Sequence, residues 1–135
     1  MRIGFTGTQR GMTDAQRTML REILTTFDHG EFHHGDCIGS DAQAHEIALE
    51  CGYCPIIHPP SDPRKRAWCE VPKHLMRREY PYMIRNHHIV DETGRLIATP
   101  AEFEEQLRSG TWSTWRYAKR KNCKVVLILP NGIIR

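Results

Sequence analysis

The feature that most limits the fold is a regular alternation of short apolar segments with longer segments of helical character. The short segments end at glycine or proline, and the longer ones repeat apolar residues every three or four positions. We expect strands over residues 2–6, 31–34, 54–58, 95–99 and 124–129, and helices over 13–28, 42–52, 81–91 and 111–121. This alternation predicts a three-layer α/β/α fold around a five-stranded parallel sheet.

The whole chain, residues 1–135, is expected to form a single domain, since its length fits one hydrophobic core. Residues 60–80 carry prolines and basic side chains without a clear period, so we expect an irregular excursion that covers a site. A short acidic helix is expected over residues 102–105. The last strand, 124–129, reads as apolar and buried on both faces.

Composition and charge favour a cytoplasmic protein with no membrane partner, because no signal peptide and no membrane-spanning run is visible. The net charge of +3 comes from short basic clusters mixed with acids, which are more typical of solvated faces than of a nucleic-acid interface. The five cysteines predict structural thiols. We expect no metal, because Cys51 and Cys54 lack a second ligand pair of matching spacing, and no cofactor.

Three polar loops containing glycine or hydroxyl residues follow the first, second and fourth strands, at residues 6–10, 35–41 and 109–114. A helix N-terminus offers free N–H groups and a partial positive charge, and glycine lets an anion approach the backbone. Turns and ordinary helix caps would also explain these residues. The strand order 3-2-1-4-5 is expected because it alone brings the three loops to one crevice at the carboxyl ends of the strands.

Two charged residues invite competing interpretations. Arg85 lies in the helix expected over 81–91, where its guanidinium would bind a phosphate in a bidentate manner or pair with Glu79 or Asp91. If it faces the crevice, it should dominate anion affinity. Asp41 is either a helix cap or an acceptor for a ribose hydroxyl.

Five segments occur in an order that resembles the SLOG superfamily of Rossmann-like nucleotide-binding proteins, which includes the lonely-guy phosphoribohydrolases and the DNA-processing protein of transformation. The segments are Thr6–Gln9, Gly35–Ala42, Arg85–Asn86, Ile97–Pro100 and Ser109–Thr114. The resemblance implies a domain that binds a nucleotide or a nucleotide-derived sugar-phosphate. The resemblance and the chemistry of the loops together give these expected ligand-binding residues: Thr6, Gly7, Thr8, Gln9, Arg10, Gly35, Gly39, Ser40, Asp41, Arg85, Asn86, Thr99, Pro100, Glu102, Ser109, Gly110, Thr111, Trp112, Ser113 and Thr114.

The resemblance also bears on catalysis and assembly. The catalytic glutamate of the phosphoribohydrolases would fall at Tyr117, which is no carboxylate, so a sensor or sequestering module is the first expectation. One alternative is an N-glycosidic phosphoribohydrolase or transferase acting on nucleoside monophosphates, with Glu102 or Asp41 as the carboxylate. A second alternative is single-stranded DNA binding through the basic clusters. The relatives pair through helices, which implies a homodimer.

Overall fold

All five strands of the sheet are parallel, and their order is β3-β2-β1-β4-β5, as the sequence predicted. The computed structural model describes residues 1–27 and 29–135. The strands are β1 (Arg2–Gly7), β2 (Glu31–His34), β3 (Cys54–Ile57), β4 (Arg95–Thr99) and β5 (Lys124–Leu127). The order in which the chain adds strands reverses between β1 and β4, where Gly7 is in register with Thr99.

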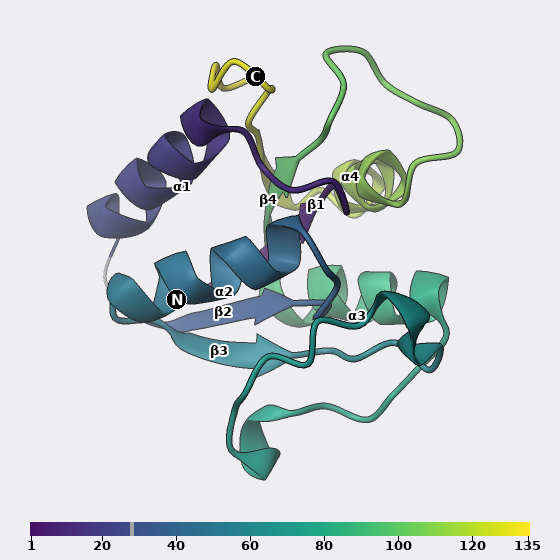
Figure 1. Ribbon diagram of the computed structural model, residues 1–135. Coiled ribbons are helices and arrows are strands. Elements are labelled where there is room, and N and C mark those ends of the chain that lie inside the picture. The colour runs from purple at the N-terminus through teal and green to yellow at the C-terminus, as the bar shows by residue number, and fades with distance from the viewer. Residues whose placement is uncertain (28) are drawn as a thin grey trace.

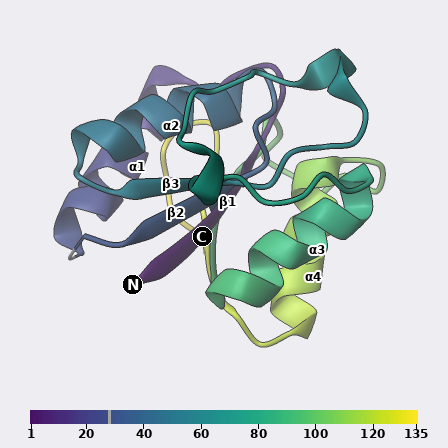
Figure 2. The same ribbon diagram turned by 90° about the horizontal axis from the view of Figure 1, so that it is seen from below.

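Four helices cover the two faces of the sheet and complete a Rossmann-like three-layer fold. They are α1 (Asp14–Thr26), α2 (Ser40–Glu50), α3 (Tyr82–Thr93) and α4 (Gly110–Arg120). The pair α1 and α2 packs on one face, and the pair α3 and α4 packs on the other (Figures 1 and 2). The helix α1 begins with a capping box, in which Thr13 and Gln16 bond each other's backbone amides.

Each face of the sheet has its own apolar core. Under α1 and α2, the rings of Phe5 and Phe32 lie 5.6 Å apart and pack with Leu20 and Leu24. All four side chains are almost completely buried, and burial of each stabilises the fold by about 1.5–3 kcal/mol. Under α4, the fully buried Trp112 packs in a cluster with residues of β4 and the β5 segment. Both helix pairs are therefore fixed firmly on the strands whose ends carry the polar loops.

The structure corrects two expectations, the acidic helix over 102–105 and the burial of the last strand, and a third concerns residue 28, which is not among the described residues. The acidic helix expected over 102–105 is wrong, since residues 101–109 are irregular. The side chain of Arg116 bonds the carbonyls of Gln106 and Leu107 and the carboxylate of Glu105, and so holds the segment in a non-helical path. The expected end of α1 at residue 28 lies outside the described residues.

The expectation of a last strand buried on both faces is also wrong. The strand β5 ends at Leu127 and forms the edge of the sheet, so most of its residues stay partly exposed. The chain then turns back, and Arg135 exchanges two backbone hydrogen bonds with Leu127. This antiparallel pairing gives partners to backbone groups that an edge strand would otherwise expose.

The excursion over residues 60–80 contains only two short 3₁₀ turns, Pro63–Lys65 and Lys73–Leu75. It is fixed to the loop after β2 by a buried ion pair, in which Arg66 Nε donates to Asp36 Oδ2 at 2.9 Å. The backbone amide of Cys69 donates to the other oxygen of the same carboxylate. Within the described part of the chain, no helix combines the length and hydrophobicity that a bilayer crossing needs.

Candidate functional site

A cleft of about 420 Å³ lies beyond the carboxyl ends of β1 and β4, where the strand order reverses. Parallel sheets of this type bind ligands at that position. The cleft is lined by Gly7, Thr8, Gln9, Arg10, Tyr82, Glu102, Arg108, Ser109, Gly110 and Thr111. It therefore joins the first and third of the polar loops that the sequence singled out.

One wall of the cleft is the tight loop after β1. The amide of Thr8 donates to the carbonyl of Thr99, and Gly11 closes the loop by donating to the carbonyl of Thr8. Gly7 has no room for a side chain, since a Cβ there would lie 2.5 Å from Ser40 Cβ and closer still to Thr99 Oγ1. The Thr99 hydroxyl is buried and has no hydrogen-bond partner among the described residues. An unpaired buried hydroxyl is costly, and it lies directly behind the wall of this cleft.

The opposite wall is the N-terminus of α4. Ser109 caps this helix by accepting a hydrogen bond from the amide of Trp112. The amides of Gly110 and Thr111 precede the first intrahelical hydrogen bond, so they are available to a ligand. The ring of Tyr82 lies against Gly110, where a Cβ would come within 2.8 Å of it. Gly110 thus lets an aromatic ring approach the amides that an anion would bind.

Two guanidinium groups and one carboxylate give the cleft its charge. Arg10 and Arg108 are exposed, and in the described part of the molecule neither side chain has an ion-pair partner. Glu102 accepts a hydrogen bond of 2.9 Å from Trp112 Nε1, which fixes its carboxylate. The cleft therefore offers cations and helix amides for an anion, and one oriented acceptor suited to a hydroxyl group.

The second polar loop, residues 35–41, supports the cleft from behind and does not line it. Ser40 donates its amide and its hydroxyl to the carbonyl of Thr8. Gly39 has a φ of 83° and packs directly on the carbonyl of Gln9, a position that only glycine fits without strain. The carboxylate of Asp41 accepts from the amide of Cys37, and burial raises its pKa to about 6. It holds the loop and does not cap the helix, whose N-cap is Gly39.

Arg85 is almost fully buried, and its hydrogen bonds go to the protein. Its Nη1 donates to the carbonyls of Gly35 and His58, and its Nε donates to Asn86 Oδ1 at 2.8 Å. No ion pair with Glu79 or Asp91 forms, since Glu79 pairs with Arg66. The guanidinium lies 4.7 Å from the centre of the Tyr82 ring. Arg85 therefore supports the Tyr82 ring, which lines the cleft, but does not line the cleft itself.

The remaining predicted residues lie next to the cleft but outside its lining. Thr6 is buried in β1, and the carbonyl of Pro100 accepts from Gln16. Trp112 is fully buried, which places it in the core and not against a ligand. Thr114 bonds the carbonyl of Gly110, while Ser113 is half-buried within α4.

Tyr117, which the resemblance aligns with the catalytic glutamate of the phosphoribohydrolases, lies outside the cleft. The hydroxyl of Tyr117 donates to Asp91 Oδ1 at 2.8 Å, and Tyr117 contributes nothing to the cleft lining. Of the two alternative carboxylates, Glu102 lines the cleft and Asp41 does not.

Sequence reasoning missed Tyr82 and Arg108. Arg108 directly precedes the cap of α4, a signal that could have identified it. Tyr82 comes from a distant helix, and only the tertiary structure brings it to the cleft. Tyr82 and Gln9 also line a second, smaller hollow of about 240 Å³, whose other walls include Cys37, Pro60 and Lys65. The excursion over 60–80 therefore borders the site, and its side chains extend the surface next to Tyr82.

A larger hollow of about 700 Å³ lies between α4 and the edge strand β5. Its lining includes Trp115, Lys119, Cys123 and Arg135 but no residue that the sequence predicted for the site. It lies on the side of the sheet and not at the carboxyl ends of the strands. We therefore favour the smaller cleft, where helix amides, glycine and unpaired cations converge.

Comparison of the chain with models of known protein families gives no match, and comparison with curated proteins gives none either. The geometry of the cleft therefore carries the functional argument.

Proposed function

We propose that the protein binds a nucleotide or nucleotide-derived sugar-phosphate in the cleft between the loop after β1 and the N-terminus of α4, as a sensor or sequestering module. The observation that carries this proposal is the convergence of Arg10, Arg108 and the free amides of Gly110 and Thr111 on one cleft, from its two opposite walls. Helix amides and guanidinium groups together suit a phosphate. Glu102 would accept a sugar hydroxyl, and the Tyr82 ring offers a surface for a base.

Isothermal titration calorimetry with AMP, ADP-ribose, ribose 5-phosphate and inorganic phosphate tests the proposal. We expect saturable binding of at least one sugar-phosphate, and an affinity about tenfold weaker for Arg108→Gln, since a hydrogen bond to a charged group is worth about 1.5 kcal/mol or more. Arg120→Gln is the matched control, because Arg120 lies at the far end of α4. No heat with any of these compounds, or equal weakening by both substitutions, would contradict the proposal.

A phosphoribohydrolase or transferase is the second candidate, favoured by the position of Glu102 in the cleft with its carboxylate fixed by Trp112. Incubation with nucleoside monophosphates and chromatography of the products would detect a released base. Release that persists at full rate in Glu102→Gln would exclude this carboxylate as the catalytic group. Release that disappears in that variant while ligand binding persists would favour the enzyme over the sensor.

The homodimer and single-stranded DNA binding stay predictions. Met83 and Ile84 on α3 are each 47% exposed and offer apolar surface to a second copy, and light scattering would detect the resulting dimer.

For single-stranded DNA binding, Arg64 and Arg77 of the basic clusters pair with carboxylates, which reduces the cationic surface open to DNA. A salt-dependent filter-binding assay would measure what remains.

A further inference from the structure

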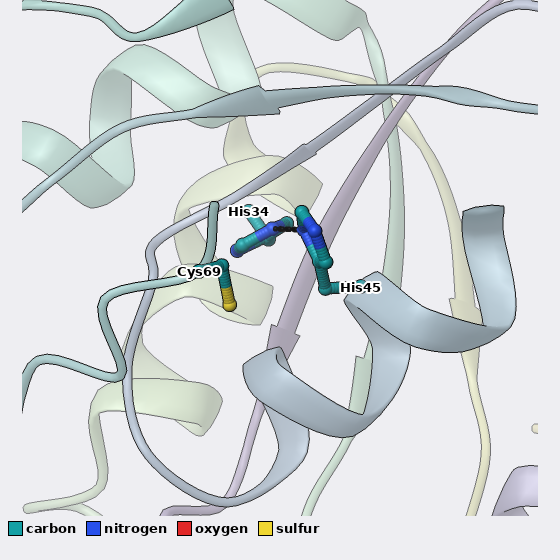
Figure 3. Close-up of side chains that lie close together, drawn as sticks. All are labelled: His34, His45 and Cys69. Carbon is teal, nitrogen blue, oxygen red and sulfur yellow. Dashed lines mark hydrogen bonds between the residues drawn. The ribbon is translucent and has the colours of Figure 1, made fainter. Parts of the chain in front are cut away.

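Two adjacent histidines of β2 face opposite sides of the sheet, and each pairs with a second histidine. On one side, His34 Nδ1 accepts a hydrogen bond from the amide of Asp36, so its proton lies on Nε2. That nitrogen donates to His45 Nδ1 at 2.9 Å. Figure 3 shows the two rings joined by this bond, with Cys69 beside them. This hydrogen bond occupies both facing nitrogens, so an ion between the rings would have to displace the proton of His34.

On the other side of the sheet, His33 pairs with His58, and this pair differs because each ring also lies next to a carboxylate, Glu31 or Glu92. His33 Nε2 lies 2.8 Å from Glu31 Oε1, and a carboxylate only accepts, so this nitrogen carries the proton. His33 Nδ1 must then accept from His58 Nε2, which lies 2.8 Å away. A neutral His58 is left with a bare lone pair on Nδ1. Burial lowers the pKa of both rings and so favours their neutral forms.

The bare nitrogen of His58 faces another electron-pair donor. Glu92 Oε2 lies 3.6 Å from His58 Nδ1, too far for a hydrogen bond. The other oxygen of Glu92 is held by Arg77, whose Nε and Nη2 lie 3.0 and 2.9 Å away. Zinc bonds histidine nitrogen and carboxylate oxygen at about 2.0–2.2 Å, which places two ligand atoms about 3.4 Å apart in a tetrahedral site. The observed separation of 3.6 Å between His58 Nδ1 and Glu92 Oε2 is thus close to the separation of two atoms that bind the same zinc ion.

The gap between these two atoms opens to a hollow of about 300 Å³ lined by His58, Arg77, Tyr80, His88, Asp91 and Glu92. The hollow shares no lining residue with the candidate nucleotide cleft. His88 precedes Glu92 by one helical turn, so both side chains lie on the same face of α3. His88 now packs edge-on against Tyr80, with the ring centres 4.6 Å apart. A change of its rotamer would offer a third ligand, and water would complete the set.

We propose that His58 Nδ1 and Glu92 Oε2 bind a divalent transition-metal ion of the zinc type, in an open site with His88 as a further ligand. The chain of hydrogen bonds from His58 to His33 and Glu31 orients the ligating ring, as the second shell of metal sites commonly does. The ion would exchange readily with solvent, unlike one in a closed structural site, because few protein ligands hold it and the positive charge of Arg77 lies nearby. The sequence predicted no metal because one ligand follows β3 and the others lie in α3, distant in the chain and without a characteristic spacing.

The test is titration of the full-length, chelator-treated protein with Zn²⁺ in a calorimeter and with Co²⁺ in a spectrophotometer. We expect one ion per chain, and Co²⁺ absorption without the charge-transfer band of a thiolate ligand. Glu92→Gln should weaken Zn²⁺ binding at least tenfold. His87→Ala is the matched control, since His87 lies on the same helix but stacks on Tyr117, and it should bind as the native protein does.

Glu92 is 35% exposed, so its substitution is compatible with folding, whereas replacement of the buried His58 risks unfolding the chain. Circular dichroism of both variants establishes that they are folded. Three outcomes would overturn the proposal: absence of Zn²⁺ binding by the native protein, unchanged binding by Glu92→Gln, or a thiolate band with Co²⁺. The last would place the ion at cysteine, as in the cluster that contains Cys69.

Discussion

The ion pair between Asp36 and Arg66 joins the loop after β2 to the excursion over residues 60–80. The Asp36 side chain is fully buried, and that of Arg66 is 6% exposed. Replacement of Arg66 by methionine keeps an unbranched apolar stem but leaves a buried carboxylate without its cation. The carboxylate of Asp36 would keep its hydrogen bonds from Cys69, which carry no charge to balance it. Removal of one partner from a buried pair costs about 3–5 kcal/mol.

Urea denaturation followed by circular dichroism measures this loss. Arg64→Met is the matched control, because Arg64 pairs with Asp62 in the same excursion but both side chains are largely exposed. We expect Arg66→Met to lower the free energy of unfolding by about 3 kcal/mol or more. The control should change nothing beyond the uncertainty of the measurement, because water screens an exposed pair.

A double variant separates loss of the pair from loss of packing. Asp36 has a φ of 57°, a conformation that asparagine also tolerates. Asp36→Asn in the Arg66→Met background removes the buried charge and keeps an acceptor for Cys69. It should therefore recover more than half of the lost stability. Equal effects of Arg66→Met and Arg64→Met, or a double variant no more stable than Arg66→Met, would refute the argument that burial decides the strength of this pair.

Three further predictions follow from the core and the cleft. Gly7→Ala forces a methyl group against Thr99 and should cost about 1–3 kcal/mol in urea denaturation; full stability would contradict the close approach. His58, whose folded pKa of about 3 lies below its ordinary 6.5, should contribute stability that is complete above pH 6.5 and is lost as pH falls towards 3. Thermal unfolding of the metal-free protein between pH 3 and 7 measures this, and stability independent of pH would be the contrary result. Trp112→Phe removes the hydrogen bond to Glu102 and leaves a small cavity, so we expect a loss of about 1–3 kcal/mol and a weaker sugar-phosphate affinity; calorimetry that shows native affinity would argue against a role for the fixed carboxylate.

Part of the site was readable in the sequence because its signals are local. The glycine and hydroxyl residues at 6–10 end β1, those at 109–114 begin α4, and both segments contribute to the cleft lining. The chemistry of a helix N-terminus depends on a few neighbouring residues, so the sequence reports it directly. The loop at 35–41 carries the same local signal, yet it packs behind the cleft, because Ser40 bonds the carbonyl of Thr8 instead of facing outward.

Long-range contacts decided the rest. From the sequence, Arg85 is expected to bind a phosphate. In the folded protein its guanidinium instead donates to the carbonyls of Gly35 and His58. Likewise, no local pattern joins His58 to Glu92, since one follows β3 and the other lies in α3. Polar groups pair with whichever groups lie near them in the folded protein. The distance between two residues along the chain says little about whether they lie close in space.

The sequence by itself indicated the parallel sheet and the two polar segments of the cleft, because hydrophobic periodicity and strand–helix alternation depend on residues close together in the chain. It favoured the strand order only through the expectation that the polar loops share one crevice, and long-range strand pairing decided that order. It did not determine the path of residues 101–109 or the exposed edge at β5. There the conformation depends on Arg116 and on the returning C-terminal residues, which reach their positions only in the folded state. The tertiary structure alone decided which polar groups face solvent and which satisfy one another in the interior.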